Sequence, residues 1–243
     1  MNCSEKLIIA LDFSSAREAL SWVKRFIPTV KYFKVGKQLF TTEGPKIVRD
    51  IQEEGGEVFL DLKFHDIPNT VYEATKAAMK LAPFMMNVHV SGGMEMMKAA
   101  REAVDQYGSH RKKTLLIGVT VLTSFTDSSL SELKIDTPVQ ELVVYYAGLA
   151  KKAGLDGVVC SVSDVSAIKK KIGKDFVTVT PGIRLAGENV LKEDQKRTAT
   201  AESALKEGTD YLVIGRSLFQ SKNPLERLKM YHVEPEGRNI SDE

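Results

Sequence analysis

The feature that most constrains the fold is an alternation, repeated eight times, of a short β-rich apolar run with a stretch of helical periodicity. The runs occupy residues 6–12, 31–36, 57–63, 84–91, 114–122, 156–161, 176–182 and 210–215. Strands that alternate with helices form parallel β-α-β units. Eight such units in 243 residues predict an α/β protein, a single-domain eightfold parallel (β/α) TIM barrel. The alternative is an open doubly wound sheet, but no G-x-G-x-x-G follows the first run, which weakens a dinucleotide-binding interpretation.

The same pattern predicts the domain boundaries and the helices. Residues 1–231 would form one barrel domain, and the polar residues 232–243 a C-terminal tail. Helices are expected after Ser14 or Ser15, and over residues 44–56, 67–83, 92–108, 138–154, 165–173, 199–208 and 223–232. Two connections, residues 123–137 and 184–197, are longer than packing requires, and each is either a lid over a site or an ordinary surface excursion.

Charge and cysteine content narrow the class of function. The net charge is only +2, and lysines and arginines are spread along the chain, which gives no reason to expect nucleic-acid or membrane binding. No stretch approaches the length of a membrane span, and the N-terminal apolar run is too short for a signal peptide. The two cysteines, Cys3 and Cys160, form no CxxC pair, so we expect a reducing, cytoplasmic environment.

Charged residues interrupt the third predicted strand, in the segment VFLDLKFHDIPNT at residues 58–70. Asp61 and Lys63 should point to the same side of the strand, and Asp66 follows just beyond. An Asp-x-Lys-x-x-Asp pattern alone is more often a surface salt bridge. Here it follows the buried run VFL, where a charge is costly unless it is paired or used. The segment is therefore either a structural ion network or a reaction centre, and its place on a buried strand favours the second.

Other strands also end in polar residues, and in a TIM barrel these ends form the face that carries the active site. The first strand closes with Asp12 and the second carries Lys34, so that Asp12, Lys34, Asp61 and Lys63 are expected on neighbouring strands. Alternating charges allow every member of such a set to stay ionised. A protonated lysine held in this way can deliver a proton to a carbanion.

The last two strands predict an anion site. They run into the segments PGIR and IGRS, at the place where barrels frequently bind phosphate. Gly215 permits close backbone approach, so that its amide and that of Arg216 can face an anion. Arg216 adds a fork of donors that matches phosphate oxygens. Arg184 and Arg216 are otherwise ordinary surface arginines, but their place after late strands, near glycines, favours the phosphate site.

The histidines and the charged set give no sign of a metal site. The fourth strand carries Asn87 and His89, and we expect His89 to be a hydrogen-bonded packing residue rather than a base. His65 should point away from Lys63 by strand alternation. No H-x-x-H or Cys/His cluster suggests zinc. The two lysines of the charged set would put positive charge against a magnesium ion, so no metal is predicted.

With these residues assembled, the chain resembles the bacterial type of orotidine 5'-phosphate decarboxylases almost from end to end. The segments that carry the resemblance are ALDF, FKVGKQLF, FLDLKFHDIPNT, NVHVSGG, VTVLTS, GLDGVVCS, VTPGIR, DQKR and VIGRS. The D-x-K-x-x-D-I-P-x-T segment is highly specific for this family, although a wider suprafamily shares part of it. Lys37 stands where an apolar residue is usual, but it lies beyond Lys34 and bears on no implied role.

The resemblance implies a cofactor-free reaction in which orotidine 5'-phosphate gives uridine 5'-phosphate and carbon dioxide, the last step of de novo pyrimidine synthesis. Lys63 would donate a proton to C6, and Asp61 would lie near the substrate carboxylate. The catalytic residues that the resemblance implies are Lys63, Asp61, Asp66 and Lys34. The substrate-binding residues that it implies are Asp12, Lys34, Ile67, Thr70, Thr123, Pro181, Arg184, Gln195, Gly215 and Arg216.

Within that set, the resemblance implies specific contacts and an assembly. Asp12 and Lys34 would contact the ribose region, and Thr123 would touch the pyrimidine. Asp66 and Thr70 would enter the active site of the other subunit, so the active form would be a homodimer. The phosphate and its closing loop would be secured by Arg184, Gln195, Gly215 and Arg216.

Two other functions stay open. One is a metal-dependent decarboxylase or aldolase of sugar phosphates from the same suprafamily. Those enzymes place an acid where Lys34 stands, so Lys34 favours the orotidine 5'-phosphate decarboxylase. The other is a non-catalytic barrel that binds a phosphorylated ligand, which leaves the pair of Asp61 and Lys63 unexplained.

Overall fold

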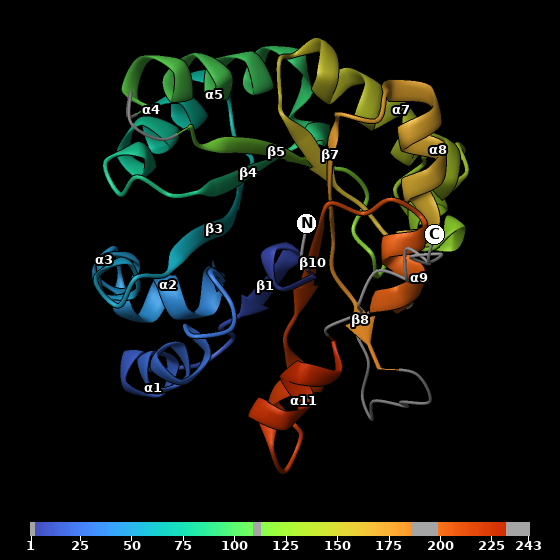
Figure 1. Ribbon diagram of the computed structural model, residues 1–243. Helices are drawn as coiled ribbons and strands as arrows, with labels where there is room; N and C mark the ends of the chain where they lie inside the picture. Colours follow the sequence, from blue (N-terminus) through green and yellow to red (C-terminus); the bar gives the residue numbers. More distant parts are fainter. Residues whose placement is uncertain (1–2, 109–112, 186–198, 232–243) are drawn as a thin grey trace, which may run out of the picture.

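A computed structural model describes residues 3–108, 113–185 and 199–231 (Figure 1). In this part of the chain, eight parallel strands close into a barrel in the order β1-β10-β7-β6-β5-β4-β3-β2. Their bounds are β1 Leu7–Ala10, β2 Tyr32–Gly36, β3 Glu57–Phe64, β4 Met85–His89, β5 Leu115–Val119, β6 Gly157–Val159, β7 Val177–Thr180 and β10 Tyr211–Ile214. Seven of the eight runs predicted from the sequence contain a whole strand, and β3 extends one residue beyond its run, to Phe64. The predicted single-domain TIM barrel is therefore confirmed, and the open doubly wound sheet is excluded.

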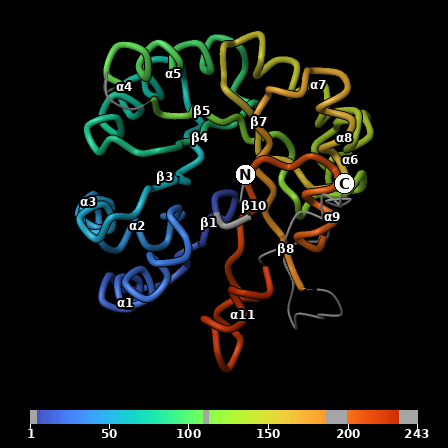
Figure 2. The backbone as a smooth tube through the Cα atoms, viewed as in Figure 1, coloured from blue at the N-terminus to red at the C-terminus, as the bar shows by residue number. Residues whose placement is uncertain are grey.

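Closure of the barrel depends on the pairing of its first and last strands, β1 and β10. They run in parallel with Leu7 opposite Leu212 and Ile9 opposite Ile214. The tube in Figure 2 shows these two segments, far apart in the sequence, lying side by side. A separate pair of two-residue strands, β8 (Ile183–Arg184) and β9 (Ala199–Thr200), was not predicted.

Helices surround the strands (Figure 1). Their bounds are α1 Ala16–Phe26, α2 Lys37–Glu43, α3 Lys46–Glu53, α4 Pro68–Met79, α5 Gly93–Tyr107, α6 Asp127–Glu132, α7 Val139–Lys152, α8 Val162–Ile172, α9 Ala201–Lys206, α10 Arg216–Phe219 and α11 Pro224–Met230. Short 3-10 turns cover Cys3–Lys6 and Val90–Gly92. The helix expected after Ser14 or Ser15 is α1, and Ser15 is its cap, accepting a hydrogen bond from the backbone of Glu18. The sequence did not predict α2, α6 or α10.

The connection at residues 123–137 is more ordered than a plain loop, because it contains α6. Thr126 caps this helix by accepting a hydrogen bond from the backbone of Ser129. Asp127 accepts a second bond from the backbone of Val139 at 2.8 Å, which ties α6 to the start of α7. Most of the other long connection, residues 184–197, and the whole predicted tail, residues 232–243, lie outside the described residues.

The barrel interior is apolar through most of its depth. Its core comprises Ile8, Ala10, Phe59, Met85, Ile117, Val179 and Val213. Three aromatic rings close the end at which the strands begin: Tyr32 lies 4.4 Å from Phe84 between ring centroids, and Tyr211 lies 5.6 Å from Phe84. Aromatic rings at such separations pack favourably as well as burying area. A second, larger core fills the space between the strands and the helices.

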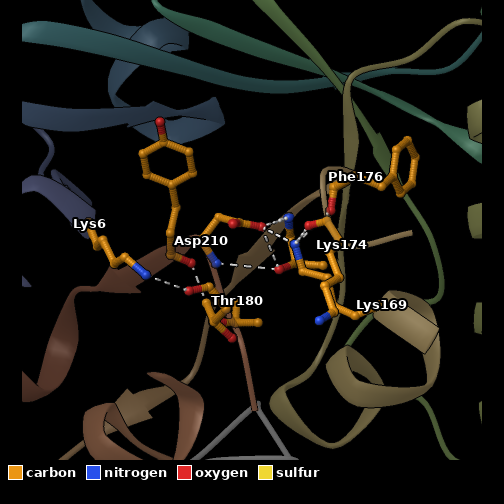
Figure 3. Close-up of polar contacts among 9 residues, drawn as sticks. Lys6, Lys169, Lys174, Phe176, Thr180 and Asp210 are labelled. Atoms are coloured by element: carbon orange, nitrogen blue, oxygen red, sulfur yellow. Dashed lines mark hydrogen bonds and ion pairs between the residues drawn. The ribbon is translucent and has the colours of Figure 1, made fainter. Parts of the chain in front are cut away.

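A network of polar contacts fixes α8 to the start of β7 and β10 (Figure 3). The ammonium group of Lys169 donates to the backbone oxygens of Lys174 and Phe176, each at 2.9 Å, and pairs with Asp210 at 2.6 Å. Asp210 also accepts from the backbone of Thr178 at 2.7 Å. Every donor of the ammonium group therefore has an acceptor at the end of the barrel opposite the charged strand ends.

No helix in the described residues is long and apolar enough to cross a membrane.

Candidate active site

The carboxyl ends of the barrel strands surround a cavity of about 270 Å³. This volume is close to the lower end of the range for small-molecule sites, roughly 300–1,000 Å³. Nine of the site residues predicted from the sequence line this cavity, and they lie on six barrel strands or in the segments that follow them: Asp12, Lys34, Asp61, Lys63, Thr123, Pro181, Arg184, Gly215 and Arg216.

Four of these side chains form a continuous chain of ion pairs. Lys34 Nζ lies 3.1 Å from Asp12 Oδ1 and 3.3 Å from Asp61 Oδ2. The other oxygen of Asp61, Oδ1, lies 2.5 Å from Lys63 Nζ. Signs therefore alternate from β1 across β2 to β3, because parallel strands bring residues at their carboxyl ends into register.

Burial and charge act in opposite directions on the middle of this chain. Burial by itself lowers the pKa of Lys34, but the carboxylates of Asp61 and Asp12 outweigh it, and the net pKa lies above the ordinary value. Burial likewise raises the pKa of Asp61, but the ammonium groups of Lys34 and Lys63 outweigh it and hold the net pKa below the ordinary value. At neutral pH both groups are therefore charged, as the sequence predicted for alternating neighbours.

The backbone of Lys63 is unusual. Its φ of 54° is left-handed, a conformation that residues with a side chain seldom adopt. The ladder between β3 and β4 is irregular at the same place, between Leu60 and Phe64. The backbone N–H of Lys63 donates instead to Asn87 Oδ1 at 2.8 Å. The catalytic candidate is thus held by a side chain of β4 rather than by a regular strand partner.

Two arginines and a glycine line the cavity beyond the ends of β7 and β10, and β10 is the barrel neighbour of β1. Arg184 is buried in β8 and its guanidinium donates to the carbonyl of Ile183 at 3.0 Å. Gly215 precedes α10, whose first residue is Arg216. A Cβ at Gly215 would lie 3.1 Å from the Cβ of Ala10, so only glycine fits there without a shift of its neighbour. The arrangement presents positive charge and close backbone to an anion.

Three predicted residues lie away from this wall within the described chain. Asp66, Ile67 and Thr70 follow β3, and all three are exposed. Asp66 Oδ1 accepts a hydrogen bond from the backbone of Ile67 at 2.6 Å. The side chain of Ile67 is large, apolar and 67% exposed. Gln195 lies outside the described residues.

His89 is the last residue of β4 and is half-buried, with its ring centroid 5.2 Å from that of His65. Burial, together with electrostatic interaction with His65, Lys37 and Lys63, lowers the pKa of His89 to about 4. The imidazole is therefore neutral at neutral pH and does not add a positive charge to the site. In the described residues, no group of three or more His, Cys, Asp or Glu side chains could hold a metal ion.

The sequence did not identify the apolar part of the wall. Ala10, Phe59, Val179 and Val213 all line the cavity. Each lies two residues before a predicted member of the site, namely Asp12, Asp61, Pro181 or Gly215, and residues two apart on a strand share a face. This spacing is the signal that would have found them. Asn87 was noted only as a polar residue on the fourth strand, and no local pattern indicates what it contacts.

Comparison with known proteins identifies the family. Residues 5–231 match the model of the orotidine 5'-phosphate decarboxylase / HUMPS family. The chain is 50% identical over 221 residues to orotidine 5'-phosphate decarboxylase of Legionella pneumophila (strain Corby), covering 91% of this chain and 95% of that protein. It is also 50% identical over 231 residues to the protein of that name from Saccharophagus degradans, covering 94% of each chain.

Solved structures agree with the sequence comparison. Orotidine 5'-phosphate decarboxylase from Lactobacillus acidophilus has a TM-score of 0.81 at 33% identity, covering 94% of this chain and 99% of that one. The enzyme from Methanocaldococcus jannaschii, complexed with the inhibitor BMP, has a TM-score of 0.74 at 26% identity, covering 94% and 97%. With a matched family model, close relatives of nearly equal length and the same barrel, the chain belongs to the orotidine 5'-phosphate decarboxylase / HUMPS family.

Proposed function

We propose that the chain decarboxylates orotidine 5'-phosphate to uridine 5'-phosphate and carbon dioxide, the last step of de novo pyrimidine synthesis, without a cofactor. The observation that carries this proposal is the chain of ion pairs Asp12, Lys34, Asp61 and Lys63 at the cavity wall. Relatives that are named for this activity and are 50% identical over nearly the whole chain support it.

Lys63 is the proposed proton donor. When the bond between C6 and the carboxylate carbon breaks, its electron pair stays on C6 and carbon dioxide leaves as a neutral molecule. An ammonium group fixed beside C6 stabilises the developing negative charge without reorganising. It then donates a proton to form the new C–H bond, and the amine regains a proton from water. The pairing of Lys63 Nζ with Asp61 at the cavity wall supports this role.

Asp61 is proposed to lie beside the substrate carboxylate. Two carboxylates in a partly enclosed site repel each other, and the departure of carbon dioxide removes that repulsion. Asp61 is suited to this because the two flanking ammonium groups keep it ionised. Asp12 and Lys34 are proposed to contact the ribose, as a hydrogen-bond acceptor and a donor for its hydroxyl groups. Thr123, on the same cavity wall, is proposed to contact the pyrimidine.

The phosphate is proposed to bind beyond the ends of β7 and β10. Arg184 and Arg216 supply positive charge there, and Gly215 allows the backbone to approach the anion. Pro181 lines the same cavity. Gln195 is proposed to join this group from a segment outside the described residues. Phosphate binding contributes to the rate although it touches no reacting atom, because remote binding energy positions the ring.

The active form is proposed to be a homodimer with shared sites. Asp66, Ile67 and Thr70 project from the end of β3 and the start of α4 and are exposed, outside the lining of their own subunit's cavity. In this proposal they contribute to the site of the second copy, where Asp66 would add a carboxylate next to Lys63. The side chain of Ile67 is large, apolar and exposed, and an interface at this place would remove it from water.

The test is turnover of orotidine 5'-phosphate by purified protein, followed by absorbance, with and without a chelator. We expect turnover that the chelator leaves unchanged. Lys63→Ala should lower kcat at least ~10²-fold, while uridine 5'-phosphate still binds. Lys46→Ala is the matched control, since Lys46 is an exposed lysine of α3 paired with Asp50, and it should leave kcat unchanged.

Each contrary result has a distinct meaning. A near-normal rate for Lys63→Ala would remove Lys63 from the mechanism. Strict dependence on magnesium would favour the sugar-phosphate enzymes of the wider suprafamily. Tight binding of uridine 5'-phosphate without any turnover by the parent chain would favour the non-catalytic barrel.

A further inference from the structure

We infer that Asn87, a buried residue of β4, is a positioning residue for the reaction: its amide group holds the Lys63 backbone and the Asp61 carboxylate in one fixed arrangement. The inference deepens the proposed decarboxylase function and rests on it. Asn87 does not line the cavity among the described residues, so it acts through the two residues that do.

The pairing of β3 with β4 explains why Asn87 is needed. Leu60 lies opposite Met86 and Phe64 lies opposite Val88. Between these pairs, β3 has three residues, 61–63, and β4 has only Asn87. A regular ladder cannot pair three residues with one, so the backbone of this part of β3 needs another partner. On its other side Asn87 keeps a regular register, opposite Ile117 of β5, which anchors it.

The two ends of the Asn87 amide supply what the ladder lacks. Asn87 Oδ1 accepts the backbone N–H of Lys63 at 2.8 Å. Asn87 Nδ2 donates to Asp61 Oδ1 at 2.7 Å. The same oxygen of Asp61 accepts a hydrogen bond from Lys63 Nζ. Asn87 therefore holds the backbone of Lys63 directly and its ammonium group through Asp61.

These hydrogen bonds keep the Lys63 backbone in its strained conformation. A residue with a side chain at φ 54° persists only where its surroundings determine it. Asn87 is 1% exposed and buried among neighbours, so water cannot take over its two hydrogen bonds. Loss of the amide would leave the Lys63 N–H and one lone pair of Asp61 without their buried partner.

Asparagine fits this position better than residues of similar shape. Aspartate offers the acceptor for Lys63 but no donor for Asp61, and it would place two carboxylates side by side. Leucine offers neither hydrogen bond. Only a neutral group with an acceptor and a donor makes both hydrogen bonds without changing the charge of the ion-pair chain.

The experiment compares the parent chain with Asn87→Ala and Asn87→Asp in orotidine 5'-phosphate turnover. We expect Asn87→Ala to lower kcat about 10²-fold, the size of effect that misplacing a reacting group produces, with little change in KM. Thr178→Val is the control. This variant removes the hydrogen bond that Thr178 Oγ1 donates to the Asp210 carboxylate, at the end of the barrel opposite the cavity. Because Thr178 is as buried as Asn87 but far from the cavity, its loss should leave kcat unchanged.

Asn87→Asp gives a readout that general loss of stability would not produce. The new carboxyl group would face Asp61 and Lys63 on β3, with Lys34 of β2 beyond Asp61 and His89 on its own strand. Next to the Asp61 carboxylate, its pKa is raised. Once protonated, it offers a donor and an acceptor, as asparagine does. The kcat of Asn87→Asp relative to the parent should therefore rise as pH falls, whereas that of Asn87→Ala should not.

A crystal structure of Asn87→Ala provides a test that is independent of turnover. We expect Lys63 to leave its left-handed conformation and its ammonium group to lose contact with Asp61. A parent-like Lys63 and Asp61 in that structure, or a parent-like kcat in both Asn87 variants, would overturn the inference. Should Asn87→Ala fail to fold, the pH profile of the isosteric Asn87→Asp decides, and a constant ratio to the parent would overturn it. Should the parent chain fail to decarboxylate, the proposed function falls, and the crystal structure alone decides the role of Asn87.

Discussion

Replacing Lys63 by glycine should leave a more stable protein than replacing it by alanine. At φ 54° a residue with a Cβ carries a penalty of roughly 1–2 kcal/mol, which glycine avoids. Against this, glycine in a strand loses roughly 0.5–1 kcal/mol relative to alanine through backbone entropy. The midpoints leave glycine ahead by about 0.75 kcal/mol in the free energy of unfolding. Other terms cancel, because both variants remove the same ammonium group and leave Asp61 with Lys34 and Asn87 as partners.

Urea unfolding, followed by the fluorescence of the single tryptophan, Trp22, measures this difference. Lys98 provides the matched control, since it is an exposed lysine inside α5 with ordinary helical backbone. There the order should be the usual one, with Lys98→Ala more stable than Lys98→Gly by about 1 kcal/mol. If the Lys98 pair behaves in this way and Lys63→Ala is still at least as stable as Lys63→Gly, the left-handed conformation of Lys63 is refuted. Both Lys63 variants should lack activity.

Three further predictions follow from the site and the scaffold. Arg216→Ala should weaken uridine 5'-phosphate binding roughly 10- to 100-fold, as the loss of charged hydrogen bonds implies, and leave uridine binding unchanged in calorimetric titration; equal losses for both ligands would contradict the phosphate role. Mixing Asp66→Ala with Lys63→Ala protein should restore activity, because hybrid dimers regain one intact site. If mass spectrometry demonstrates subunit exchange and activity still does not recover, the sites are not shared. Asp210→Asn should lower the free energy of unfolding by about 1–3 kcal/mol by weakening its contact with Lys169, and a changed kcat would show that this end of the barrel affects the site.

The barrel was predictable because its strands carry a strong local signal. A parallel strand covered on both sides is a short continuous apolar run, and several runs here carry polar residues at or just beyond their ends, which mark the functional face. The helices that escaped prediction are short and bury little. α2 buries only Leu39, and α6 only Leu130, so neither has enough apolar positions to display a helical period. The Ser- and Thr-rich start of α6 resembles a loop by composition.

The charged members of the site were predictable for the same reason, whereas Asn87 was not. Asp61 and Lys63 are charged residues in an apolar run, so each can be recognised from the sequence alone. The role of Asn87 depends on three residues of β3 lying opposite one residue of β4, which is a property of the pairing and not of either segment alone. Strand registers of this kind are set by tertiary structure, and a pattern along one strand cannot report them.

The two ends of the barrel give a reason to assign the charges to chemistry rather than to folding. Where the strands begin, the interior is closed by Tyr32, Phe84 and Tyr211, whose packed rings need no ion pairs. Where the strands end, the same barrel carries two carboxylates and two ammonium groups, of which Lys34 and Asp61 are buried, although replacing buried ion pairs by apolar residues is often neutral or stabilising. A fold that closes one end with rings has no structural need for charges at the other. The strained backbone of Lys63 lies at the charged end as well, and strain that contributes nothing to folding is expected where it orients a reacting group.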